Sequence, residues 1–304
     1  MIRILLFLVL CLCTTLSAST IDMITDAGTS AKTLALANIE GLDSDAYSVL
    51  ENPAAMHYST GRKTSVFYTT LADQETQYIT AAHTFPLKRF TIGLGLAQRQ
   101  SPNLDFTQHN ELTNRTYSES TFEANDRLYR VAISGTLYKG LSIGAATHYY
   151  SSTAHNYKGS GANGDFGLAF QSKRFALSAN FKNIARVSKI SYNQGISSAK
   201  FPTRFSFSGK VKALSYATLY AQINYYMKQT LFTRSLALEL SSKKILQSNA
   251  NLYIGYNQAY VSGLVKPRLT AGIGLNVTRL KFQFVYSHTP KSLETDLFGF
   301  SISL

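Results

Sequence analysis

The residues that could carry out chemistry are dispersed along this chain of 304 residues. Six histidines stand in separate segments, and none pairs with another at the His-x-x-x-His spacing that places two metal ligands on one helix face. They are His57, His83, His109, His148, His155 and His288. A Ser-His-Asp triad assembled from distant segments stays open, because such a triad is defined by geometry and not by spacing. The pattern predicts no enzyme, no metal site and no cofactor.

Thiol chemistry is limited by where the cysteines stand. Both of them, Cys11 and Cys13, fall in an N-terminal stretch that has the parts of a secretory signal. Arg3 gives a positive start, and the apolar run Ile4–Cys13 is too short for a membrane anchor. We expect residues 1–19 to be removed, which leaves a mature chain without disulfides or zinc-thiolate sites.

The composition favours a membrane β-barrel. The chain has 19 Tyr, 18 Phe and no Trp, and only 15% of its residues are charged. Tyr and Phe favour strands, and Tyr also favours membrane interfaces. A wall that is apolar outside and polar inside needs this mixture.

The basic charge does not indicate nucleic acid. The net charge is +13, but Lys and Arg stand singly or in pairs, as at Lys139 and Lys173-Arg174, and no basic run alternates with aromatic residues. Soluble turns and attraction to anionic lipid head groups account for this distribution.

An apolar residue at every second position recurs from residue 65 onward. Phe205, Phe207 and Val211 alternate with serine and lysine, and Phe90, Ile92, Leu94 and Leu96 do the same upstream. Such alternation places one face in an apolar medium and the other in a polar one. We predict about fourteen strands, at 65–71, 76–85, 89–99, 127–138, 141–152, 164–171, 174–183, 201–213, 215–228, 231–241, 249–258, 267–277, 279–288 and 294–304.

The connections between these strands are alternately short and long. Four long ones are predicted as external loops: Gln100–Asp126, Thr153–Asn163, Ile184–Lys200 and Ala259–Lys266. The glycine-rich stretch 159–164 is expected to be a flexible external connection, and Asp126 and Asp165 are expected to be solvated residues at strand starts. Short turns on one side and long loops on the other are typical of bacterial outer-membrane barrels. The fold class is therefore all-β, a transmembrane antiparallel up-and-down barrel formed by residues 65–304.

The last strand resembles the assembly signal of outer-membrane barrels. Phe298, Phe300, Ile302 and Leu304 alternate with small residues at the C-terminus. Such signals usually end in Phe, so Leu304 is a departure. We expect the barrel-assembly machinery and outer-membrane lipids to be partners.

The segment at 20–64 differs from everything after it. Ala31–Asn38 has a helix-favouring composition, and Gly41 could end a short helix. Pro53 fixes its own φ and pushes Asn52 out of helical geometry, so these two residues and Ala54 form a rigid corner.

The run from Ala31 through Asp43 and Asp45 to Asn52-Pro53-Ala54 resembles the N-terminal signature of the PorV/PorQ family, within the FadL-type superfamily of outer-membrane barrels. That signature has acidic residues followed by Asn-Pro-Ala and usually glycine, where this chain has Ala55. Three further stretches are similar to the family: Gly140–Gly144, Gly164–Leu168, and Asn183 with the later Phe201-Pro202.

The resemblance implies a barrel of about fourteen strands with residues 20–64 as a hatch or plug in the lumen. In FadL-type proteins hydrophobic molecules enter from outside and leave sideways, so the expected function is passage of a hydrophobic ligand such as a fatty acid. In PorV-type proteins the barrel instead docks and shuttles secreted proteins of a type IX-like system. A soluble exported β protein is a third interpretation, which would need polar outward faces. Six glycines could kink strands beside a ligand path or relieve packing: Gly93, Gly95, Gly135, Gly144, Gly272 and Gly274.

Overall fold

The structure is a computed structural model that describes residues 27–71, 76–110, 115–185, 189–193, 198–242, 249–261, 264–289 and 296–304. The predicted signal peptide lies outside these residues. Within them, none of the helices has the length and apolar content needed to cross a membrane.

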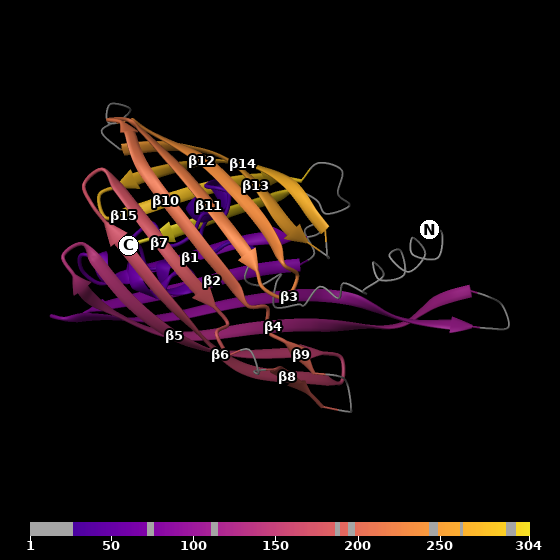
Figure 1. The fold of residues 1–304 in the computed structure, drawn as a ribbon. Helices are drawn as coiled ribbons and strands as arrows, with labels where there is room; N and C mark the ends of the chain where they lie inside the picture. The colour runs from indigo at the N-terminus through magenta and orange to yellow at the C-terminus, as the bar shows by residue number, and fades with distance from the viewer. Residues whose placement is uncertain are drawn as a thin grey trace, which may run out of the picture.

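The described residues form a closed antiparallel barrel of fourteen strands (Figure 1). The strands are β1 (Lys63–Leu71), β2 (Thr76–Pro86), β3 (Phe90–Asn110), β4 (Arg115–Tyr138), β5 (Leu141–Ala154), β6 (Tyr157–Gln171), β7 (Phe175–Lys182), β10 (Arg204–Leu214), β11 (Ala217–Tyr226), β12 (Leu231–Ser242), β13 (Asn249–Val261), β14 (Leu264–Val277), β15 (Leu280–His288) and β16 (Leu297–Ser303). Neighbours along the chain pair in order, and β1 pairs with β16 to close the barrel. Two short strands, β8 (Lys189–Tyr192) and β9 (Ala199–Lys200), lie between β7 and β10 in the chain. The predicted fold class is confirmed.

Three predicted long loops are wrong in extent, because strands continue into them. β3 and β4 extend the hairpin to Asn110 and Arg115, and this hairpin projects far beyond the barrel (Figure 1). β6 begins at Tyr157, so the glycine-rich stretch 159–164 is strand. The alternation that identifies a strand inside a bilayer is lost where both faces meet water, although the backbone ladder continues.

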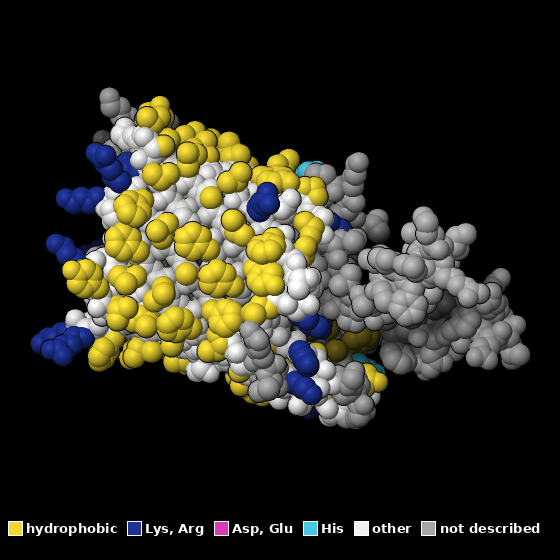
Figure 2. All heavy atoms as spheres, in the orientation of Figure 1, with side chains coloured by type: hydrophobic (Ala, Val, Ile, Leu, Met, Phe, Trp, Pro, Cys, Tyr) yellow, Lys and Arg dark blue, Asp and Glu magenta, His cyan; other side chains and the backbone are white. Residues whose placement is uncertain are grey.

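The outward face carries the apolar members of the alternation. Large side chains such as Phe207, Leu236 and Phe300 are exposed there. Figure 2 shows hydrophobic side chains as a broad band around the visible side, with Lys and Arg mainly at its two margins, including the end that carries the short turns. We call this end, with the β4–β5 turn at Lys139-Gly140 and the β6–β7 turn at 172–174, the short-turn end.

The N-terminal segment, defined here as residues 27–59, contains three short helices. They are α3 (Ala31–Ala35), α4 (Ser48–Glu51) and the 3-10 helix η1 (Pro53–Tyr58). Ser30 caps α3 by accepting a hydrogen bond from the Thr33 N–H. The helix ends before the expected Gly41, because Ala37 and Asn38 already adopt positive φ.

Candidate functional site

The N-terminal segment is buried in the lumen of the barrel. Its contacts are made with inward-facing side chains of widely separated strands. The Thr80 hydroxyl on β2 donates to the Thr29 carbonyl at 2.8 Å, and the Thr270 hydroxyl on β14 donates to the Ala35 carbonyl at 2.8 Å. Ser142 on β5 likewise donates to the Ala54 carbonyl at 2.9 Å. The wall therefore holds the segment from several sides.

The predicted corner at Asn52 is present. Asn52 has extended backbone geometry, with φ −126° and ψ 113°, and Pro53 begins η1. The Asn52 side-chain oxygen accepts from the Ala54 N–H at 2.9 Å, while its amide nitrogen donates to the Leu168 carbonyl at 3.0 Å and to the Ser178 hydroxyl at 2.7 Å. Asn52 is fully buried. One side chain thus fixes the corner internally and attaches it to β6 and β7.

Glycines of the barrel wall make room for the corner. A Cβ at Gly144 would lie 2.5 Å from the Pro53 carbonyl carbon, and a Cβ at Gly167 would overlap the Asn52 side chain. The same crowding is found at other inward-facing glycines, where the neighbours are Val49, Leu50, Ala35 or Tyr253; these glycines are Gly93, Gly95, Gly272 and Gly274. Of the six glycines considered as kinks, five therefore admit lumenal groups to the wall. Gly135 does not, since its nearest neighbour is the Arg89 carbonyl at 3.4 Å.

Asp43 and Asp45 lie toward the short-turn end and form ion pairs. Asp43 accepts from Lys32 and from Lys210, both at 2.9 Å, and Asp45 accepts from Lys281 at 2.6 Å. Burial opposes ionisation of Asp43, but the two lysines outweigh it and hold the pKa of that carboxyl well below its usual range. Both predicted acidic residues thus anchor the segment to the wall.

The sequence did not single out Glu40, which makes the most buried of these attachments. Its carboxylate accepts from Arg204 at 2.9 Å and from Lys182 at 2.6 Å, and all three side chains are no more than 7% exposed. Burial raises the pKa of Glu40, while the two cations lower it more, so the net shift is downward. The partners stand more than 140 residues away, which is why no local pattern points to them.

Glu51 is the second buried acid that sequence reasoning missed, and its surroundings differ. It accepts hydrogen bonds from the Thr29 and Thr33 hydroxyls and from the Gly41 N–H, but no cation is paired with it in the described residues. Burial and the nearby Glu40 charge raise the pKa of Glu51 from 4.5 to about 7, against the effect of these hydrogen bonds. The segment therefore contains a carboxyl that titrates near neutral pH.

We expect the docked segment to lose stability as the pH rises from about 5 to 8. The pKa of Glu51 is raised on docking from 4.5 to about 7, so the protonated form is favoured when docked and the cost of ionisation is fully present above pH 7. That cost is on the order of 3 kcal/mol. Protease cleavage within residues 27–59, followed at pH 5.5 and 8, measures it.

The matched variant for this pH dependence is Glu51→Gln. It keeps the shape of the side chain and removes the titration. We expect its cleavage rate to be nearly equal at the two pH values. If Glu51→Gln keeps the pH dependence of the parent, another group is responsible and the assignment to Glu51 is wrong.

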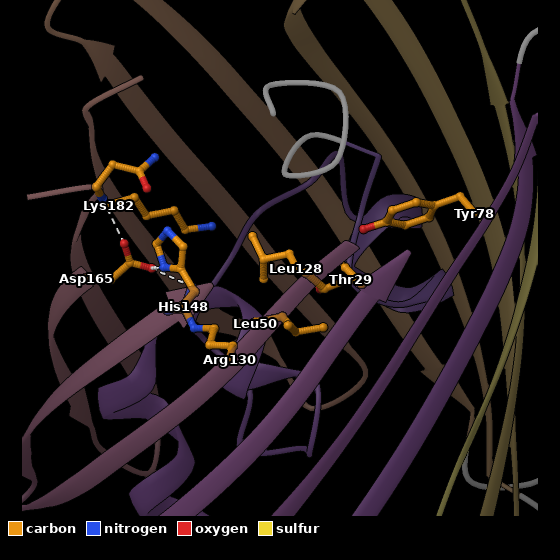
Figure 3. Close-up of a pocket in the computed structure, with 10 residues that line it drawn as sticks. Thr29, Leu50, Tyr78, Leu128, Arg130, His148, Asp165 and Lys182 are labelled. Atoms are coloured by element: carbon orange, nitrogen blue, oxygen red, sulfur yellow. Dashed lines mark hydrogen bonds and ion pairs between the residues drawn. The ribbon is translucent and has the colours of Figure 1, made fainter. Parts of the chain in front are cut away.

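A second buried cluster lies in the lumen beside Leu50 of the segment (Figure 3). Arg130 forms an ion pair with Asp165, which also accepts from the Asn183 N–H at 2.7 Å and lies 3.9 Å from His148 Nδ1. These groups, with Leu50 and Lys182 among others, line a cavity of about 30 Å³. Such a volume holds about one water molecule.

The prediction that Asp126 and Asp165 are solvated strand ends is wrong. Both are buried, because β3 to β6 continue past them and both residues face the lumen. Asp126 is paired with Arg99 and accepts from the Tyr150 hydroxyl at 2.6 Å.

Phe201 and Pro202, which precede β10, contact residues near this cluster. The Phe201 ring lies 5.8 Å from the His148 ring and 6.5 Å from the Tyr150 ring. The Asn183 amide donates to the Pro202 carbonyl at 2.7 Å. Two stretches that carried the family resemblance, at 183 and at 201–202, are therefore in direct contact.

Ser142 stands in Gly140-Leu-Ser-Ile-Gly144, a Gly-x-Ser-x-Gly spacing, so the sequence-based interpretation that this motif is absent was wrong. The structure places Ser142 in β5, where its hydroxyl bonds to the carbonyls of Ala54 and Ala169. A nucleophile elbow instead needs a strand-to-helix turn and an adjacent histidine. Among the described residues no group of three or more His, Asp or Glu side chains could hold a metal ion.

No family model matches the sequence, and no curated protein matches it. Solved structures match the fold. The toluene transporter TodX of Pseudomonas putida superposes with a TM-score of 0.63 at 10% identity, over 91% of this chain and 97% of its own. The toluene transporter TbuX of Ralstonia pickettii gives 0.59 at 11% identity, over 91% and 97%. A FadL homologue of Pseudomonas aeruginosa gives 0.59 at 12% identity, over 90% and 97%. The chain therefore shares its fold with FadL-type barrels, as the resemblance predicts, while membership of the PorV/PorQ family stays a prediction.

Proposed function

We propose that the protein is a non-enzymatic barrel of the bacterial outer membrane that passes hydrophobic small molecules, with the N-terminal segment as its hatch. The observation that carries this proposal is the mode of attachment of the segment. It fills the lumen and is held by hydrogen bonds and ion pairs to the wall, with no covalent link between Asn52 or Glu40 and the strands they contact. Such contacts can be exchanged, so the segment can move aside without unfolding the barrel.

The fold supports the class of ligand. The barrels that share this fold include two described as toluene transporters. An apolar ligand that leaves the lumen sideways meets the hydrophobic band of the outer wall rather than water (Figure 2). A fatty acid or a monoaromatic hydrocarbon fits this route.

Deleting residues 31–56 should open the lumen to small ions and abolish selective uptake. The deletion removes Glu40, Asn52 and the packing against the wall glycines, while the strand pairs that close the barrel remain. Planar-bilayer conductance and uptake of labelled toluene and palmitate by cells measure the two effects. A correctly inserted deletion protein with the conductance of the parent would count against a hatch.

A second proposal is a docking barrel for secreted proteins. It is favoured by the β3–β4 hairpin, which projects beyond the barrel where a partner could reach it (Figure 1). The two proposals differ in what they require of this hairpin. Removing residues 102–123 leaves uptake intact if the first is right, and abolishes capture of a secreted protein if the second is right.

A further inference from the structure

The hydrophobic band contains a pronounced hollow. A groove of about 780 Å³ lies on the wall over β7 and β10 to β14 and is lined almost wholly by apolar side chains. Gly209 and Ala221, which are cross-strand partners, both line the groove, and their small side chains leave this part of the outer surface hollow. Bulkier residues such as Phe175, Leu219 and Leu236 border it. The volume is within the range of about 300–1,000 Å³ that is typical of sites for small ligands.

One end of the groove meets a group of cations at the short-turn end. Phe175, which lines the groove, directly follows Lys173 and Arg174 in the β6–β7 turn. Lys212 on β10 adjoins them, since its N–H donates to the Arg174 carbonyl at 2.8 Å. All three cations are exposed, and no ion pair is found for them among the described residues.

A polar pocket of about 310 Å³ adjoins these cations. Phe175 lines this pocket as well as the groove, although the pocket opens to the lumenal side of the wall and the groove to its outer side. The pocket also contains Lys32 and Lys210, which are paired with Asp43, and the carboxylate of Glu239. Five cations against two carboxylates leave an excess of positive charge for an anionic group.

We propose that the groove and the three cations form a binding site for one anionic glycerophospholipid of the surrounding bilayer. Its acyl chains lie over Gly209 and Ala221, and its phosphate lies between Lys173, Arg174 and Lys212. The charge complementarity selects the head group, and the apolar groove selects the chains. The position agrees with this ligand, because the groove faces the hydrocarbon and the cations stand where the apolar band ends, which is the level of head groups. A protein partner is less suited to a groove that opens inside the band.

The test is native mass spectrometry of the protein released from vesicles of equal parts phosphatidylcholine and phosphatidylglycerol with identical acyl chains. We expect one retained phospholipid, with phosphatidylglycerol favoured by at least about tenfold, because each Lys or Arg close to an anionic lipid contributes roughly a fivefold preference. The variant Lys173→Ala/Arg174→Ala/Lys212→Ala should lose this preference. The control Lys88→Ala/Arg89→Ala/Lys139→Ala removes equal charge from other turns and should keep it.

A second pair of variants tests the groove without changing charge. Ala221→Leu fills the hollow and should reduce retention of either lipid by about tenfold, whereas Ala145→Leu, on the outward face of β5, should not. Heat-modifiable migration on gels shows whether each variant is folded. Equal loss of phosphatidylglycerol in both charge variants would overturn the proposal, since it would indicate only general attraction. Retention unaffected by Ala221→Leu, or a retained apolar molecule without a phosphate, would also overturn it.

Discussion

Replacing Gly144 with valine is expected to leave the barrel intact and to release the N-terminal corner from the wall. Any Cβ at this position meets backbone atoms of Pro53 and Ala54, which cannot turn aside as a flexible side chain would. Overpacking of this kind costs typically 1–3 kcal/mol. The equilibrium constant between the docked and the displaced corner should therefore shift toward the displaced state by a factor on the order of ten to a hundred.

The readout is ion conductance in planar bilayers, where Gly144→Val should spend far more time in conducting states than the parent. Gly135→Val is the matched control, because Gly135 lies on the neighbouring strand β4 and its nearest neighbour leaves room for a Cβ. If the folded Gly144→Val protein has the same low ion conductance as the parent, the corner does not seal the lumen.

Glu40→Ala should cause the largest loss of stability of any single substitution in the segment. It leaves Lys182 and Arg204 buried without the carboxylate that both now contact. Breaking a buried ion pair by removing one partner costs about 3–5 kcal/mol. Denaturant unfolding in detergent, followed by tyrosine fluorescence, measures the change in the free energy of unfolding.

Two further variants separate this effect from the loss of any acid. Asp45→Ala is the control, since the Lys281 side chain is 38% exposed and can be solvated, so a loss of only about 0–1 kcal/mol is expected. Glu40→Leu/Lys182→Met/Arg204→Met replaces the whole cluster by apolar groups and should recover most of the stability. If the triple variant is as unstable as Glu40→Ala, the unpaired cations are not the cause.

The strands were predictable because the bilayer imposes a simple rule on them. Phe205 and Phe207 must face hydrocarbon while Ser206 and Ser208 face the lumen, and this apolar–polar alternation is visible within a few consecutive residues. Beyond the bilayer the rule no longer applies, so the extension of β3 to Asn110 left no signal in the alternation.

The contacts of the lumen could be predicted only in part. The corner at Asn52 follows from the proline beside it, and the resemblance indicated the acidic residues near it. The partners of Glu40 could not be found, because they depend on the curvature that brings β7 and β10 to the segment. One signal was available: Lys182 and Arg204 occupy inward positions of strands whose outward positions are apolar, and the segment carries acids that could pair with them.

The positions of the wall residues that hold the segment have a consequence for the closed barrel. Ser142 on β5 and Thr270 on β14 both hold the segment, and they stand on opposite sides of the seam where β1 meets β16. The hydrogen bonds of the docked segment therefore join strands from the two ends of the sheet across this seam. Closure itself rests on the strand pairs between β1 and β16, so docking of the segment is expected to follow closure and to add to the stability of the closed seam.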